Sequence, residues 1–209
     1  MRDFRPSVTF RAHQAKPAHR ELYSKTGILH HDISLANLMV RSDDHSVGIL
    51  IDLDVAVRIK DGHRDVPFKP VPGGTIPFRA VELLRDEPAT KLFYRYDLES
   101  FFYVLVWILT YSETGFSAKR DTLEDWHKGG WRVFSSGKRA FMSTDWLLPL
   151  GPLTEVWLAP LRRMFYEGFK AESRAITSRS IEALDQETLD GNVTYERFMN
   201  IITEGDTAR

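Results

Sequence analysis

Three polar side chains that can act on phosphate groups lie within the first quarter of the chain. Asp32 precedes Asn37 by five residues, and Asp52 follows fifteen residues after Asn37. A carboxylate such as Asp32 can orient a hydroxyl group and accept its proton. Carboxylate and amide oxygens are also the hard ligands that Mg²⁺ prefers beside phosphate oxygens. The residue types and their spacing therefore indicate phosphoryl-transfer chemistry, with Asp32 at the hydroxyl and Asn37 and Asp52 at the metal.

Short apolar runs surround these polar residues and must position them. Ile28 and Leu29 precede the loop that carries Asp32 and Asn37, and the runs over 38–41 and 47–51 follow it. The polar sequence between these two runs predicts a β-hairpin. The two ends of such a hairpin bring Asn37 and Asp52 close together. A helix over about 17–25 should precede the loop and end at Gly27.

A second element expected to organise the fold is the uncharged stretch from Ser100 to Ser112. It is too short to cross a bilayer, which takes about 20 residues, so no membrane is expected as a partner. A short helix that is apolar on every side is normally buried inside protein. We expect a central helix over 97–112, with Asp97 capping its start.

Four motifs in the same order resemble those of protein kinases. HHDISLAN at 30–37 resembles the catalytic loop H-R-D-x-x-x-x-N. IDLD at 51–54 resembles the metal-binding D-F-G segment, and GTIPFRAVE at 74–82 resembles the end of an activation segment that closes with A-P-E. DLES at 97–100 resembles the D-x-W-S that opens the buried central helix. Together they are most similar to the fungal-type protein kinase family.

The resemblance implies a mainly α fold with a small β-hairpin, namely a protein-kinase-like C-lobe lacking the N-terminal β-lobe. It would be a single domain over residues 1–209, with its metal segment at 52–54 and its activation segment at 52–82. The implied cofactors are Mg²⁺ and ATP. The implied partner is a protein substrate or another protein, and the oligomeric state is not indicated.

The resemblance also assigns roles residue by residue. Asp32 and Asn37 would be the catalytic pair; Asn37, Asp52 and Ser34 would face the nucleotide; and Asn37, Asp52 and Asp54 would hold the metal. Ser34 stands where many protein kinases have Lys and favours local hydrogen bonds over contact with phosphate. Asp54 replaces a family Gly and is equally well a metal ligand or a turn residue. His30 is expected to pack and hydrogen-bond near the segment that bears Asp52.

The segment between the IDLD motif at 51–54 and the GTIPFRAVE motif at 74–82 differs in composition from its neighbours. Residues 58–73 are polar, rich in Gly and Pro and without a period, which predicts an irregular surface segment. No Ser, Thr or Tyr occurs over 54–74, which argues against a phosphorylation switch there. His31 agrees, because the family Arg that would pair with such a phosphate is absent. Thr75 and Phe78 are expected to form part of the surface that a protein substrate contacts.

Charged and helical features of the remaining chain lead to three further expectations. Glu82 should form a buried ion pair with Arg174 or, as the competing partner, Arg163. Residues 153–171 should form two helical pieces that meet at Pro160. A last helix should begin after Thr194 and end just before Gly205.

Composition excludes several classes of function. The 209 residues carry a net charge of -1, which gives no electrostatic case for binding nucleic acid or an anionic membrane. The absence of Cys excludes disulfides, thiol catalysis and Cys-based zinc sites. The polar N-terminus lacks the apolar core of a signal peptide, so we expect an intracellular location, in the cytoplasm or nucleus.

Elements that a working kinase needs are missing from this sequence. It contains no G-x-G-x-x-G motif, and no strand Lys precedes Gly27. The first hypothesis is therefore a Ser/Thr-type protein kinase fragment, which transfers phosphate from ATP to protein hydroxyls in the intact family and is inactive as an isolated chain. The second is a pseudokinase or interaction module. The third is a small-molecule kinase of the aminoglycoside-phosphotransferase type, against which the GTIPFRAVE and DLES motifs speak.

Overall fold

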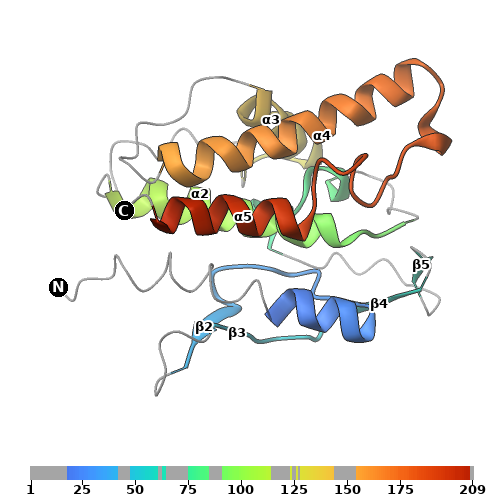
Figure 1. Ribbon diagram of the computed structural model, residues 1–209. Helices are drawn as coiled ribbons and strands as arrows, with labels where there is room; N and C mark the ends of the chain where they lie inside the picture. The colour runs from blue at the N-terminus through green and yellow to red at the C-terminus, as the bar shows by residue number, and fades with distance from the viewer. Residues whose placement is uncertain are drawn as a thin grey trace.

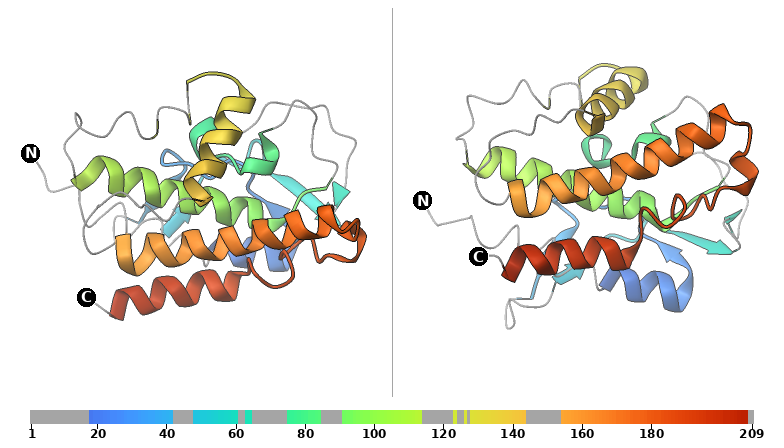
Figure 2. Two further views of the ribbon diagram at one scale, coloured as in Figure 1. Left: turned by 90° about the horizontal axis from the view of Figure 1, so that it is seen from above. Right: turned by 45° about the horizontal axis from the view of Figure 1, so that its top comes forward.

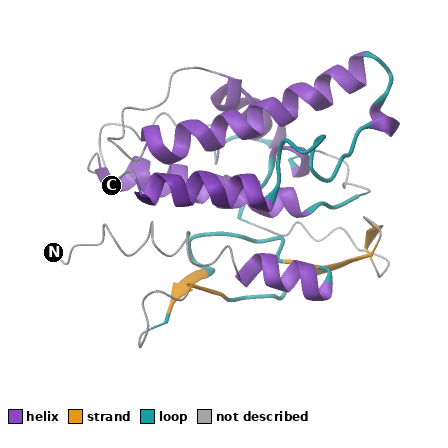
Figure 3. Ribbon diagram, viewed as in Figure 1, coloured by secondary structure: helices purple, strands orange, loops and turns teal. Residues whose placement is uncertain are grey.

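The computed structural model describes residues 18–41, 48–60, 63–64, 75–84, 91–113, 123, 126, 128–143 and 154–207. Three long helices lie side by side, and a fourth helix crosses them (Figures 1 and 2). The strands and a helix over 18–26 lie along the other side of this layer (Figure 3). The long helices are α2 (Tyr94–Glu113), α4 (Ala159–Thr177) and α5 (Tyr195–Thr207), and the crossing helix is α3 (Trp131–Ser143). The described part is mainly helical with small antiparallel sheets, as expected, and is compatible with a partial kinase-like fold.

Helix α2 is the centre of the core, as its sequence predicts. Every side chain from residue 94 to 110 is buried except Trp107, which is half-buried. Burying one large apolar side chain contributes roughly 1.5–3 kcal/mol, so this helix contributes strongly to the stability of the fold. It begins at Tyr94 rather than at the expected position 97. None of the helices in the described part of the chain has the length and apolarity needed to cross a membrane.

The hairpin that should bring the candidate residues together is present. Strands β2 (Leu38–Val40) and β3 (Gly48–Leu50) pair antiparallel, with Leu38 opposite Leu50 and Met39 opposite Ile49. The polar turn expected at 42–46 lies outside the described residues.

A second sheet corrects the expectation of an irregular segment after residue 58. Its strand order is β1 (Ile28–Leu29), β4 (Val57–Lys60), β5 (His63–Arg64), and both pairings are antiparallel. In β4 buried and exposed side chains alternate, because Val57 and Ile59 face the core. The V-R-I-K sequence carries this period-two signal, which the surrounding Gly and Pro residues obscured. Residues 65–74 of the expected loop lie outside the described part.

Gly27 ends the first helix, as predicted, and also lets two backbones approach each other. Its φ of 69° lies in the left-handed region, and its carbonyl accepts a hydrogen bond of 2.7 Å from the Ile59 amide. A Cβ atom at this position would lie 2.7 Å from the Ile59 carbonyl oxygen. Glycine is therefore required where β1 starts beside β4.

The C-terminal helices confirm one expectation and correct another. A π-helical turn (Thr154–Leu158) leads into α4, which has Pro160 in its first turn, so the two pieces meet where predicted. Gly205 was expected just past the last helix but lies inside α5 and is buried. A Cβ atom there would lie 2.2 Å from ring atoms of Trp157. Glycine at this position serves close helix packing rather than helix termination.

Candidate active site

The loop between β1 and β2 brings the predicted acid and amide into direct contact. The Nδ2 atom of Asn37 donates to the backbone carbonyl of Asp32 at 2.9 Å and to its Oδ2 atom at 3.2 Å. The other carboxylate oxygen, Oδ1, accepts hydrogen bonds from the Thr75 amide at 2.8 Å and the Thr75 hydroxyl at 2.9 Å. Asp32 is therefore held from its own loop and from a segment 43 residues away.

Ser34 lies inside this loop rather than on its surface. Its exposed fraction is 2%, and its backbone carbonyl accepts a hydrogen bond of 3.2 Å from the backbone N–H of Asn37. This contact closes a tight turn that aims the Asn37 side chain at Asp32. The burial supports the local role that the residue type favours, and nucleotide binding by Ser34 stays a prediction.

Asp52 follows directly after the strand that pairs with the loop. The Ile51 amide donates to the Asn37 carbonyl at 3.1 Å, which places Asp52 one residue from the point where the two segments meet. The Asp52 side chain is exposed, and its backbone adopts a left-handed φ of 66°. Non-glycine residues rarely adopt this conformation, and such outliers gather at functional sites.

The donor set at this edge fits Mg²⁺ in part. The Nδ2 atom of Asn37 is used toward Asp32, and no hydrogen bond to its Oδ1 atom is formed by the residues that the structure describes. Asn37 and Asp52 thus offer an amide oxygen and a carboxylate oxygen, and Asp54 adds an exposed carboxylate two residues on. Within the described ranges, no three His, Asp or Glu side chains gather as a metal site. Mg²⁺ commonly takes only one or two carboxylates and completes its shell with water and phosphate oxygens, so metal binding by Asn37 and Asp52 stays a prediction.

His30 ties the two halves of the candidate site together. Its Nε2 atom lies 2.9 Å from the Ile51 carbonyl oxygen, and its Nδ1 atom lies 3.3 Å from the Asp32 amide nitrogen. A carbonyl can only accept and an amide N–H can only donate, so Nε2 donates to the Ile51 carbonyl and Nδ1 accepts from the Asp32 amide. The ring is fully buried. The expected structural role of His30 near the Asp52 segment agrees with these contacts.

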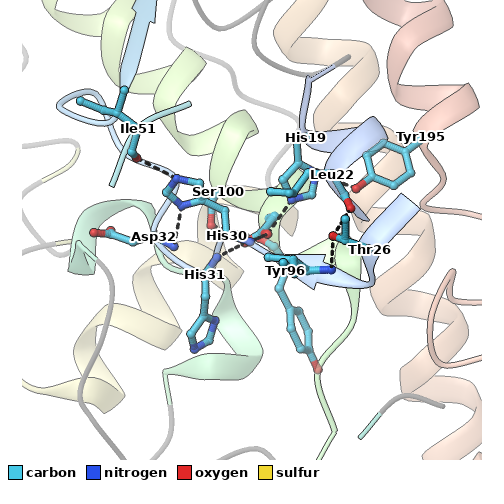
Figure 4. A network of polar contacts seen from close by, with 12 residues as sticks. His19, Leu22, Thr26, His30, His31, Asp32, Ile51, Tyr96, Ser100 and Tyr195 are labelled. Atoms are coloured by element: carbon cyan, nitrogen blue, oxygen red, sulfur yellow. Dashed lines mark hydrogen bonds and ion pairs between the residues drawn. The ribbon is translucent and has the colours of Figure 1, made fainter. Parts of the chain in front are cut away.

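The loop rests on a buried carboxylate at the start of α2. Asp97 accepts the amide hydrogens of His30 at 2.8 Å and His31 at 3.1 Å. It was expected to cap its own helix, but it lies in the first turn and binds the backbone of another segment instead. Figure 4 shows these contacts, with the His31 ring pointing away from them. The backbone of His31 adopts a left-handed φ of 65°.

Two residues that sequence reasoning missed complete this support. The His19 ring lies 2.7 Å from Asp97 through Nε2 and 2.6 Å from the Tyr195 hydroxyl through Nδ1 (Figure 4). Burial alone would raise the pKa of Asp97, but attraction to His19 and to the loop histidines lowers the pKa below its usual value. Asp97 therefore stays an anion. No local pattern could reveal the contact between His19 and Tyr195, which are 176 residues apart in the sequence.

The segment 75–84, which bears Thr75, is held by a buried ion pair whose partner differs from the expected one. Arg95 donates from Nη1 to Oε1 of Glu82 at 2.6 Å and from Nη2 to Oε2 at 2.9 Å. The Tyr96 hydroxyl donates to the same carboxylate at 2.7 Å. The expected partners, Arg174 and Arg163, lie exposed on α4. Arg95 is the partner because the start of α2 lies directly against Glu82.

Two further buried charges hold the same segment, and the sequence singled out neither. Glu99 accepts the Val81 amide at 2.9 Å and the Tyr103 hydroxyl at 2.6 Å through Oε1. Lys138, on α3, donates from Nζ to the Ile76 carbonyl at 3.3 Å and to the Arg79 carbonyl. Both side chains are almost fully buried. Burial lowers the pKa of Lys138 to about 7, although the negative charge of Glu99 opposes this shift.

Comparison with known proteins agrees with the motifs. Residues 13–109 match the model of a family described as fungal protein kinase, whereas no curated protein matches the chain. The match includes the acid–amide loop, the segment after β3, the segment that carries Thr75 and most of α2. It confirms the resemblance seen in the motifs and supports a kinase-related function in the transferase class. Residues 13–109 of this chain are therefore similar in sequence to the fungal protein kinase family.

Proposed function

We propose that this chain is the helical lobe of a Ser/Thr-type protein kinase, in which Asp32 orients the acceptor hydroxyl of a protein and accepts its proton. The observation that carries the proposal is the set of three hydrogen bonds on the Asp32 carboxylate. Two come from Thr75 to Oδ1, and one comes from Asn37 to Oδ2. They hold the carboxylate in one orientation before any substrate binds.

The count of lone pairs on Asp32 indicates where the substrate would bind. An ionised carboxylate offers about four acceptor positions, two on each oxygen. Thr75 takes both positions on Oδ1, and Asn37 takes one on Oδ2. No residue in the described part of the chain takes the remaining position on Oδ2, which leaves it for a hydroxyl hydrogen. A positioned base of this kind contributes about 10²–10⁴-fold to the rate of proton transfer.

Asn37 and Asp52 are the residues proposed to hold Mg²⁺, with Asp54 as a third candidate. When bound, the metal would neutralise the charge on the phosphates of ATP. The protein itself would supply oxygen ligands in fixed positions. The Asn37 amide is oriented by its bonds to Asp32, and Asp52 is oriented by the Ile51 contact with Asn37.

An exposed apolar strip supports the view that this lobe works together with a second one. Met39 and Ile49 are opposite each other in the hairpin and are 48% and 37% exposed. Ile51 and Leu53 continue the strip, at 38% and 48% exposed. This strip leads directly to Asp52, so it is suited to lie under the adenine of ATP and a β-rich lobe. Because a clamp that positions ATP supplies most of the rate, we expect no measurable transfer by the isolated chain.

A fusion experiment tests the proposal. The chain is expressed alone and fused behind the β-lobe of a family member, and transfer of labelled phosphate from Mg–ATP to a generic protein and to an aminoglycoside is measured. We expect transfer to protein by the fusion only, with a loss of about 10²-fold or more in Asp32→Asn. Glu196→Gln, an exposed acid on α5, is the matched control and should leave the rate unchanged. A fusion whose rate is indifferent to Asp32→Asn would refute the assignment of Asp32.

The second candidate function is a nucleotide-free interaction module. It is favoured by the same apolar strip, which a partner protein could cover. Titration calorimetry of the chain with Mg–ATP separates the two candidates. Saturable binding that Asp52→Ala removes supports the kinase lobe. No heat of binding, for the chain and for the fusion alike, supports the interaction module.

A further inference from the structure

Arg79 lies four residues after Thr75, and its guanidinium has no hydrogen-bonding partner in the described part of the protein. The Nε atom is buried without a hydrogen bond, and no described residue forms a hydrogen bond or ion pair with the side chain. Its guanidinium lies over the Trp131 ring, whose centroid is 5.7 Å from Cζ. Native proteins contain few such groups, and each calls for an explanation.

The surroundings of Arg79 are electrostatically unbalanced. Burial lowers the pKa of Arg79, and the negative charge of Asp32 opposes this only in part. The buried Lys138 lies nearby, since its Nζ atom donates to the Arg79 carbonyl, and the positive charge of Arg79 helps lower the pKa of this lysine. Desolvating a cation without hydrogen bonds is costly, so an anion that entered this place would be bound favourably.

The backbone that carries Arg79 is fixed on both sides. Lys138 holds the carbonyls of Ile76 and Arg79, and its Nζ atom lies 4.0 Å from the centroid of the Tyr103 ring. Glu99 holds the Val81 amide. A guanidinium on such a fixed segment loses little freedom when it binds a ligand. This is the preorganisation that a recognition residue requires.

We propose that Arg79 recognises an anionic group, a carboxylate or a phosphate, on the molecule that is presented to Asp32. Arginine is suited to this role because its planar fork pairs with both oxygens of such a group. The inference rests on the proposed kinase function, since it names the substrate class of the same site. Thr75 binds Asp32 and is on the same short segment as Arg79, so the anion belongs close to the acceptor hydroxyl. The substrate is then a protein with an acidic or phosphorylated residue near its Ser or Thr, or the anion is a phosphate of ATP.

A binding experiment that needs no catalysis tests this. The chain is labelled with ¹⁵N at arginine, and the Nε–H signal of Arg79, assigned with Arg79→Gln, is followed. Three probes are titrated: a serine peptide with Glu on both sides of the serine, the same peptide with Gln, and Mg–ATP. Arg163→Gln is the matched control, because Arg163 is exposed on α4 and its loss changes the net charge equally.

We expect the Glu peptide to shift the Arg79 signal saturably and to bind about tenfold more tightly than the Gln peptide. Arg79→Gln should remove this ratio, and Arg163→Gln should preserve it. If only Mg–ATP shifts the signal, the anion is a phosphate of the nucleotide. Equal binding of both peptides together with no response to Mg–ATP overturns the proposal. A Glu preference that survives Arg79→Gln overturns it as well.

The outcomes also separate this proposal from the kinase function. In the β-lobe fusion, phosphate transfer that depends on Asp32 but shows no preference for Glu and no response at Arg79 defeats the role of Arg79 alone. An Arg79-dependent Glu preference in a fusion that transfers nothing defeats the catalytic assignment of Asp32 and leaves an anion-binding module. Asp32→Asn in the chain should keep the Glu preference, because it removes no group that binds the anion.

Discussion

Helix α2 and the β2–β3 hairpin are both apolar in sequence, yet the fold treats them in opposite ways. In α2, Phe101, Phe102 and Leu105 have at most 1% of their surface exposed. In the hairpin, Met39 and Ile49 keep 48% and 37% exposed. The helix has neighbours from several elements, whereas no described element covers the face of the hairpin that Met39 and Ile49 share. The side chains of α2 are therefore covered by other elements, whereas the hairpin keeps an apolar surface that a ligand or a second lobe can contact.

The difference extends to the polar groups of the two regions. Charges on α2 are buried and paired: Arg95 binds Glu82, and Asp97 binds His19 and the loop backbone. Beside the hairpin, Asp52 and Asp54 are exposed. Buried, paired groups set positions, and exposed groups remain available for ligands. The molecule thus supports the loop over 30–37 with buried, paired groups and carries exposed carboxylates beside the hairpin.

The largest effect should come from breaking the buried ion pair at the start of α2. Arg95→Met leaves the Glu82 carboxylate buried without its fork of donors, which should cost about 3–5 kcal/mol of unfolding free energy in urea titration. Lys25→Met, which breaks an exposed pair with Glu21, is the control and should cost about 1 kcal/mol or less. Equal losses in the two variants would show that burial does not distinguish them.

Removing apolar volume from the middle of α2 should have the next largest effect. Leu105→Ala leaves a cavity in the core, with an expected loss of roughly 2–5 kcal/mol in the same titration. Ile176→Ala, on α4, removes a similar volume from a side chain that is 59% exposed and serves as the control. A loss below about 1 kcal/mol for Leu105→Ala would mean that α2 is not the centre of the core.

The dependence of stability on pH tests whether water is excluded beside α2. Burial and the positive charge of Arg79 lower the pKa of Lys138 to about 7 against the opposing negative charge of Glu99, whereas the unfolded chain keeps the ordinary value of 10.5. Between these values the unfolded state binds more protons, so stability rises with pH, by up to about 1.4 kcal/mol per pH unit. Unfolding at pH 7, 8 and 9 should show this slope, and Lys138→Met should flatten it. A wild-type slope no steeper than that of the variant contradicts the buried ammonium.

The smallest effect on stability is expected in the hairpin. Met39→Ser removes a side chain that is already half exposed, so the unfolding free energy should change by less than about 0.5 kcal/mol. In the β-lobe fusion the same variant should weaken the binding of Mg–ATP, measured by calorimetry. A stability loss comparable to that of Leu105→Ala would mean that the hairpin face is covered.

Local patterns in the sequence predicted the parts of the fold that depend on neighbouring residues. The helix end at Gly27, the hairpin and the two pieces at Pro160 all follow from residues within a few positions of one another. The strand β4 was missed because Gly and Pro residues nearby hid its short alternation. Gly205 was misinterpreted because glycine ends helices and also admits close packing, and only the position of Trp157 decides between the two.

The sequence by itself determined that an acid and an amide five residues apart would share one loop, and that a helix apolar on all sides would be buried. Both follow from chain connectivity and the cost of exposing apolar surface. Only the tertiary structure decided the partners: Arg95 for Glu82, His19 and Tyr195 behind Asp97, and none among the described residues for Arg79. Such contacts join segments that are far apart in the chain, so they depend on how the elements pack rather than on any local pattern.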